Sequence, residues 1–187
     1  MQTKKRIILG SASPRRRELL EQIGISFEVR VSDKEEVYHS LIPEEIVKEL
    51  ALSKAKNVAD DLREKQEQVK QISFDKKNNV LLDTIVIGAD TIVVSDGSIL
   101  GKPKDEADAV RMIRSLQGRS HKVYTGVAIL DYDDEGKRKS VVHAVETEVF
   151  VNPMSDEEIR EYAATGEPLD KAGAYGIQGQ FAAYIER

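Results

Sequence analysis

The sequence contains no cysteine and no tryptophan, and only 5% of its 187 residues are aromatic. The absence of cysteine excludes a disulfide scaffold, thiolate metal sites and thiol catalysis, and it fits a reducing compartment. Scarce aromatic side chains leave few platforms on which the bases of a single-stranded nucleic acid could stack. We therefore expect a cytoplasmic protein that uses neither disulfides nor thiols.

Long apolar runs are also absent. No apolar segment approaches the roughly 20 residues that span a bilayer, and the N-terminal residues lead directly into a short strand, so we expect neither a membrane span nor a signal peptide. The net charge is −5, whereas proteins that bind nucleic acid usually carry a broad basic field. Local basic clusters on an acidic chain favour a small anionic ligand and disfavour nucleic acid or a membrane as partner.

Residues 8–20, ILGSASPRRRELL, carry the first functional signal. Ser13 suits an N-cap and Pro14 the first helical position, so the stretch predicts a strand that leads into a helix. The free N–H groups of such a helix start, next to Arg15 and Arg16, favour an anion. An ordinary capped helix with a solvated arginine face is the alternative, and the motif alone favours neither.

Apolar periodicity along the chain predicts alternating strands and helices. We expect strands at residues 6–10, 25–31, 80–87, 91–94, 123–129, 139–151 and 181–185, and helices over 14–23, from Pro43 through 62, from Asp105 to Gly118 and from Ser155 to Gly166. Residues 63–79 are highly charged and predict a helix extension followed by an exposed loop. Long antiparallel neighbours near 120–151 favour an α/β fold with a mixed sheet, in one domain or two small lobes.

Asp90 follows Gly88-Ala89, where an apolar run is interrupted, so we expect it at a strand end. A carboxylate there can orient a water, act as a base or hold a divalent metal. Taken alone, Asp90 fits a turn aspartate that accepts backbone N–H groups at least as well.

Four cations could converge on one polyphosphate: Arg15, Arg16, Lys54 and Lys102. Taken separately, each lysine favours a plain surface role. The acidic pair Glu35-Glu36 could supply metal oxygens, since Mg²⁺ prefers one or two carboxylates plus substrate phosphates; a solvated acidic run is the alternative.

Several other chemistries are excluded. His121 and His143 lack a paired ligand at metal spacing, so both favour structural roles. Ser11 and Ser13 lack the histidine and aspartate of a nucleophile triad. No G-x-x-x-x-G-K-[ST] loop is present, so the chain is not a P-loop enzyme.

Six short motifs then occur in a fixed order. They are S-x-S-P-R-R-x-E-L-L at 11–20, the acidic pair at 35–36, L-A-x-x-K-A at 50–55, G-A-D-T at 88–91, G-K-P at 101–103 and D-K-A-G-A-Y-G-I-Q-G at 170–179. Each is weak alone, but the ordered set covers nearly the whole chain and resembles the Maf family of nucleoside triphosphate pyrophosphatases.

The resemblance implies an elongated mixed β-sheet with flanking helices and two lobes around a cleft, as in inosine triphosphate pyrophosphatases. It implies a single Maf-like domain over residues 1–187 and a possible homodimer. The family's usual chain continues with a further strand and a helix, so we expect a closing element that these 187 residues lack.

The resemblance also implies an activity, namely hydrolysis of a nucleoside triphosphate to the monophosphate and pyrophosphate with Mg²⁺ or Mn²⁺. It gives Asp90 as general base and metal ligand, Glu36 as a metal ligand, Ser13, Arg15, Arg16, Lys54 and Lys102 as substrate-binding residues, and Arg15, Thr91 and Gln178 as the positions that distinguish the subfamily acting on dTTP and UTP.

The leading hypothesis is therefore a dTTP/UTP pyrophosphatase that removes unwanted, including modified, pyrimidine nucleotides. The alternative is a nucleotide-binding regulator of cell division with little or no catalysis. A nucleic-acid binder is a third hypothesis, which the acidic net charge disfavours.

Overall fold

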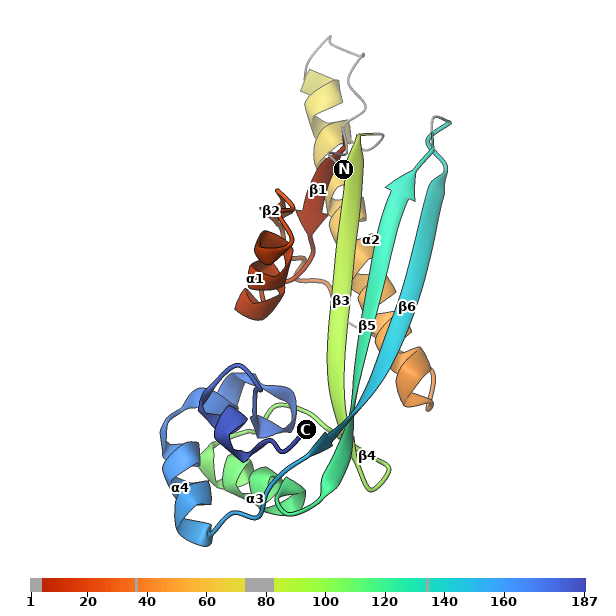
Figure 1. The fold of residues 1–187 in the computed structure, drawn as a ribbon. Helices are drawn as coiled ribbons and strands as arrows, with labels where there is room; N and C mark the ends of the chain where they lie inside the picture. Colours follow the sequence, from red (N-terminus) through yellow and green to blue (C-terminus); the bar gives the residue numbers. More distant parts are fainter. Residues whose placement is uncertain (1–4, 36, 73–82, 134) are drawn as a thin grey trace. The chain divides into compact units, whose positions relative to one another are not determined.

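The computed structural model describes residues 5–35, 37–72, 83–133 and 135–187 (Figure 1). The elements run in the order β1 (Arg6–Leu9), α1 (Pro14–Gln22), β2 (Glu28–Val29), α2 (Pro43–Ile72), β3 (Thr84–Ser95), β4 (Ser98–Leu100), α3 (Glu106–Leu116), β5 (Ser120–Tyr132), β6 (Arg138–Phe150) and α4 (Asp156–Ala164). Three short 3-10 helices follow, η1 (Glu167–Asp170), η2 (Ala172–Ala174) and η3 (Gln180–Tyr184). No helix in the described part of the chain is long and apolar enough to cross a membrane.

The strands form one mixed sheet in the order β2-β1-β3-β5-β6, with β4 paired to β3. β1 is parallel to both neighbours, with Ile8 opposite Glu28 on β2 and Val86 on β3. β4 is antiparallel to β3 through a hairpin whose turn residues Asp96 and Gly97 both have positive φ. The α/β fold with a mixed sheet, expected from the sequence, is confirmed.

Contacts divide the chain into two compact units. Unit 1 comprises residues 1–90 and 126–144, and unit 2 comprises residues 91–125 and 145–187. β3, β5 and β6 each contribute residues to both units.

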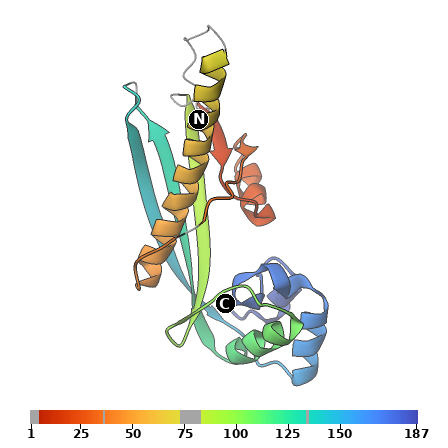
Figure 2. The ribbon, with the colours of Figure 1, turned by 180° about the vertical axis from the view of Figure 1, so that it is seen from behind.

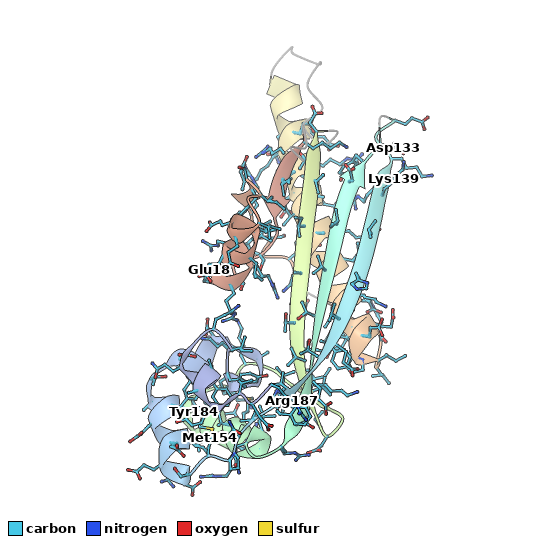
Figure 3. All side chains as sticks on the ribbon, in the orientation of Figure 1. Glu18, Asp133, Lys139, Met154, Tyr184 and Arg187 are labelled. Atoms are coloured by element: carbon cyan, nitrogen blue, oxygen red, sulfur yellow. The ribbon has the colours of Figure 1, made fainter. Side chains whose placement is uncertain are left out.

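Unit 1 is built by packing α2 against the strands, as Figure 2 shows from behind. The apolar periodicity of residues 46–62 predicts one buried face of α2. Leu62 on that face is half-buried, and the following residues are buried: Ile46, Val47, Leu50, Ala51, Ala55 and Val58. Glycines let the helix approach closely, since a Cβ on Gly88 would lie 2.2 Å from the Ala51 carbonyl oxygen and one on Gly126 would lie 2.2 Å from that of Val47. The glycine in G-A-D-T thus accommodates a helix and does not interrupt the strand. At the far end of the unit, Asp133 and Lys139 form an ion pair across the β5–β6 turn at 3.4 Å (Figure 3).

Unit 2 has its own core, in which α3 and α4 contact each other. Both helices begin where the sequence predicts, and each is capped: the Asp105 side chain accepts from the Asp108 N–H at 2.8 Å, and Ser155 and Glu158 form a capping box. Phe181 is fully buried and its ring contacts those of Tyr162, Tyr175 and Tyr184. Met154 belongs to this core and the partly buried Tyr184 packs against it; both are labelled in Figure 3.

Some sequence predictions were wrong. Leu19, Leu20 and Ile23 predict an apolar stripe on the helix over 14–23, but in α1, all of whose residues the structure describes, none is buried, and Leu19 is 52% exposed. The strand expected at 25–31 shortens to two residues, because only Glu28 and Val29 pair with β1. Residues 181–185 were expected to be a strand, but most of them belong to η3, and strand-like pairing is confined to Ile185 opposite Val151. The helical part of 63–79 is confirmed through Ile72, and the rest lies outside the described residues.

Candidate functional site

Asp90 lies inside β3 and not at a strand end as the sequence suggested. Its carboxylate accepts from the Lys54 ammonium group of α2 at 2.5 Å. The two side chains are only 15% and 20% exposed, respectively. A bond between residues 36 positions apart therefore fixes one carboxylate and one cation side by side, next to the close α2–β3 contact at Gly88.

Arg16 lies in the same unit and reaches the same stretch of β3. Its Nη1 donates to the Ala89 carbonyl at 2.8 Å and to the Ser11 hydroxyl at 2.9 Å. Ser11 is buried and also accepts from the Ser13 N–H at 3.3 Å. The S-x-S-P-R-R motif is thus tied to the residue that precedes Asp90, and α1, α2 and β3 together present Arg16, Lys54 and Asp90.

Ser11 is the residue whose role the sequence analysis missed. Ser13 does occupy the N-cap position of α1, with extended backbone, but its side chain makes no capping hydrogen bond to the described residues. The buried hydroxyl of Ser11, two residues earlier, holds the arginine instead. In the sequence, the motif S-x-S-P-R-R was the only signal for this contact, and it does not indicate which of the two serines is buried.

Arg15 is half-buried in the first turn of α1. Glu36, the second expected metal ligand, lies outside the described residues. Within the described ranges, no three histidine, aspartate or glutamate side chains gather closely enough to hold a metal ion. Mg²⁺ needs only one or two protein carboxylates when substrate phosphates and waters complete its shell, so the Asp90 carboxylate fits a metal that arrives with a triphosphate.

The remaining candidates lie in unit 2. Thr91 shares a hydrogen bond with Thr125 of β5, at 3.1 Å between the hydroxyl oxygens. Lys102 is exposed in the G-K-P loop. That loop meets the glycine-rich segment 170–179, because the Gly173 N–H donates to the Gly101 carbonyl at 3.0 Å.

Gly173 is required at this junction for two reasons. Its φ is +68°, and a Cβ would lie 3.0 Å from the Val93 side chain. Gln178 lies at the exposed tip of a turn in the same segment. The structure therefore brings together the motifs that contain Lys102 and Gln178, within unit 2.

A buried histidine supports this segment. His121 is 4% exposed, and its Nε2 lies 2.7 Å from the Tyr175 hydroxyl. Burial, with a smaller contribution from the Arg119 charge, lowers the pKa of His121 to about 4. The ring is therefore neutral at pH 7, which agrees with the structural role expected for it.

Comparison with known proteins shows which family the chain belongs to. Residues 6–187 match the family described as Maf-like protein. The chain belongs to the Maf family.

Maf relatives resemble this chain along almost all of it. It is 44% identical over 180 residues to a protein of Agathobacter rectalis named dTTP/UTP pyrophosphatase, covering 96% of this chain and 85% of that protein. A protein of the same name from Dictyoglomus turgidum is 45% identical over 186 residues, covering 98% and 85%.

Among solved structures, a HAM1 protein from Coxiella burnetii is similar with a TM-score of 0.48 and 16% identity, over 96% of this chain and 91% of that one.

Proposed function

We propose that this Maf protein hydrolyses dTTP and UTP to the nucleoside monophosphate and pyrophosphate. The observation that carries the proposal is the Lys54–Asp90 pair with Arg16 bound at Ala89, because it combines one carboxylate with two cations in a sparingly exposed setting. Relatives with 44–45% identity that are named dTTP/UTP pyrophosphatase support the choice of substrate.

The proposed chemistry needs a water, a base and a way to stabilise the leaving group. Asp90 accepts a proton from the attacking water or orients it toward the α-phosphorus. The bond from the α-phosphorus to the bridging oxygen breaks, and negative charge builds on pyrophosphate. Arg15, Arg16, Lys54 and Lys102 hold that charge, which is the main electrostatic demand of such a reaction.

The proposed metal, Mg²⁺ or Mn²⁺, would be held by Asp90 and Glu36 together with phosphate oxygens, and it would supply charge neutralisation at the triphosphate. For base recognition we propose Arg15, Thr91 and Gln178. A glutamine amide both donates and accepts, which suits the edge of a pyrimidine that carries a ring N–H beside a carbonyl.

The test is product analysis with a panel of dTTP, UTP, dCTP, dATP and dGTP in the presence of Mg²⁺, before and after chelation by EDTA. We expect monophosphate and pyrophosphate in equal amounts, fastest from dTTP and UTP, and loss of turnover with EDTA that Mg²⁺ restores. Release of diphosphate and orthophosphate would overturn the proposed bond cleavage. Tight nucleotide binding without turnover would support the regulator hypothesis instead.

A further inference from the structure

Gln178 is presented by a tight turn in unit 2. The Gly179 N–H donates to the Gly176 carbonyl at 3.1 Å, which closes the turn and leaves Ile177 and Gln178 at its exposed tip. A four-residue surface turn with two glycines has little rigidity of its own, because glycine gives up more conformational freedom than any other residue when ordered. Whatever fixes Gln178 must therefore come from outside the turn.

Two side chains, from α4 and η1, support the turn at its C-terminal end. The Gln180 N–H donates to the Glu167 carboxylate at 3.0 Å. The Tyr162 hydroxyl donates to the other oxygen of Glu167 at 3.2 Å. The hydroxyl and the carboxylate thus form one bridge that ends at the residue that follows the turn.

The carboxylate occupies the space that a side chain at position 179 would need. A Cβ built on Gly179 would lie 1.9 Å from Glu167 Oε1 and 2.4 Å from its Cδ. Gly179 has a φ of −108°, a value that other residues adopt readily, so the glycine is explained by the carboxylate and not by the backbone.

Both members of the bridge are themselves fixed. Tyr162 is buried, its ring lies 5.1 Å from that of Phe181, and burial together with the Glu167 charge raises its pKa, so it stays a hydroxyl donor. The Glu167 N–H donates to the Thr165 hydroxyl at 3.2 Å, and its carbonyl accepts from Lys171 at 2.6 Å. A bridge anchored in the core therefore controls an exposed tip.

We propose that Glu167 and Tyr162 are positioning residues that hold the turn so that Gln178 meets the substrate base in one orientation. This inference rests on the proposed role of Gln178 in base recognition. Neither side chain needs to touch the nucleotide. Their loss should weaken the choice between bases more than it slows the chemical step.

The experiment compares kcat and KM for dTTP and dCTP. In dCTP the C4 carbonyl is replaced by an amino group, N3 carries no proton, and the 5-methyl group is absent. In Glu167→Ala we expect the preference for dTTP over dCTP to fall about tenfold, because a small misplacement of a recognition group has a large effect. The kcat at saturating dTTP should change less than about threefold, since that step depends on other residues. Glu167→Gln keeps an acceptor for the Gln180 N–H and should retain most of the preference. Exposed Glu161 of α4 supplies the matched control, Glu161→Ala.

Gly179→Ala tests the same bridge from the other side. The added methyl group should displace the carboxylate and reproduce the loss of preference seen in Glu167→Ala. In the double variant Glu167→Ala/Gly179→Ala the methyl group enters empty space, so the two effects should not add. The single variant Gly179→Ala also keeps the proposal testable if thermal unfolding shows that Glu167→Ala is poorly folded.

The outcomes separate the two proposals. An unchanged preference in Glu167→Ala and Gly179→Ala, with a lost preference in Gln178→Ala, would overturn the positioning role and leave the proposed function standing. Additive effects in the double variant, or a preference in Glu167→Gln as low as in Glu167→Ala, would also overturn it. Absence of pyrophosphate release by the unmodified protein would instead overturn the proposed function.

Discussion

Lys54 pairs with the proposed base and is also a proposed phosphate-binding cation, two roles that an ordinary surface lysine does not have. Its ammonium group is 2.5 Å from the Asp90 carboxylate, and the pair is only sparingly exposed. A charge-assisted hydrogen bond of this kind fixes the orientation of the carboxylate and leaves its second oxygen for water or metal. The proposed base and one of the proposed phosphate-binding cations are therefore set in place before a substrate arrives.

We predict that Lys54→Ala lowers kcat/KM for dTTP by about 30-fold or more, which corresponds to about 2 kcal/mol for one lost charge-assisted contact. The control is Lys56→Ala, since Lys56 is exposed on the same helix. Steady-state kinetics check this. A loss of equal size in both variants would show that overall positive charge, and not the Lys54–Asp90 pair, is what matters.

The lowered pKa of His121 predicts how the free energy of unfolding depends on pH. Its pKa is lowered to about 4 from 6.5, so between these values the unfolded chain binds a proton that the native protein does not. Its contribution to stability is full above about pH 6.5 and falls as the pH drops toward 4. We expect the free energy of unfolding to decrease by about 2 kcal/mol from pH 8 to pH 5 on account of this residue.

Denaturant unfolding of the unmodified protein and of His121→Phe at pH 8 and pH 5 measures the contribution of His121 to the free energy of unfolding. The phenylalanine ring fills the same space and does not titrate, so the variant should show a decrease between pH 8 and pH 5 that is about 2 kcal/mol smaller. Parallel pH profiles for the two proteins would mean that His121 is not kept neutral by burial.

At the scale of elements, the contact between α2 and β3 controls the site. Gly88 lies directly beneath the helix backbone, two residues before Asp90 and close to the turn that carries Lys54. A strand with a side chain at position 88 could not approach α2 this closely. The distance between the two catalytic candidates therefore depends on a residue that has no side chain.

We predict that Gly88→Ala destabilises the protein by about 3 kcal/mol or more, because the methyl group would meet backbone atoms that cannot rotate away. Gly101→Ala is the matched control, since a Cβ there would meet no heavy atom within 4 Å. Thermal or denaturant unfolding of both variants checks the prediction. A Gly88→Ala variant as stable as the control would show that α2 and β3 are not in such close contact.

The elements also show what sequence can and cannot predict. The capping box at Ser155 and the hairpin at Asp96-Gly97 were predictable, because each depends on neighbours in the chain. The interruption read into Gly88 was wrong, because the reason for that glycine lies on α2, more than 30 residues away. Likewise η3 replaces an expected strand, since only Ile185 finds a partner to pair with.

At the scale of the whole molecule, the ordered motifs predicted the family that the comparison confirmed. The contacts of the candidate residues could not be derived in the same way. The Lys54–Asp90 bond, the Arg16–Ala89 bond and the bridge from Glu167 to Gln180 each join residues from different elements, and single-sequence patterns carry no signal for such pairs. The division into two units could not be derived from sequence patterns either, because the chain passes from one unit to the other after residues 90, 125 and 144.

The most direct test of the central claim is pyrophosphate release from dTTP with Mg²⁺ by Asp90→Asn, beside Asp96→Asn as the control. Asp96 lies in the exposed β3–β4 hairpin and pairs with Arg119. We predict that Asp90→Asn loses at least about 1,000-fold in kcat, since the amide cannot accept the proton from water, while its thermal stability and its binding of dTTP persist. Asp96→Asn should turn over dTTP at the unmodified rate. An Asp90→Asn protein that still releases pyrophosphate at close to the unmodified rate would contradict the account.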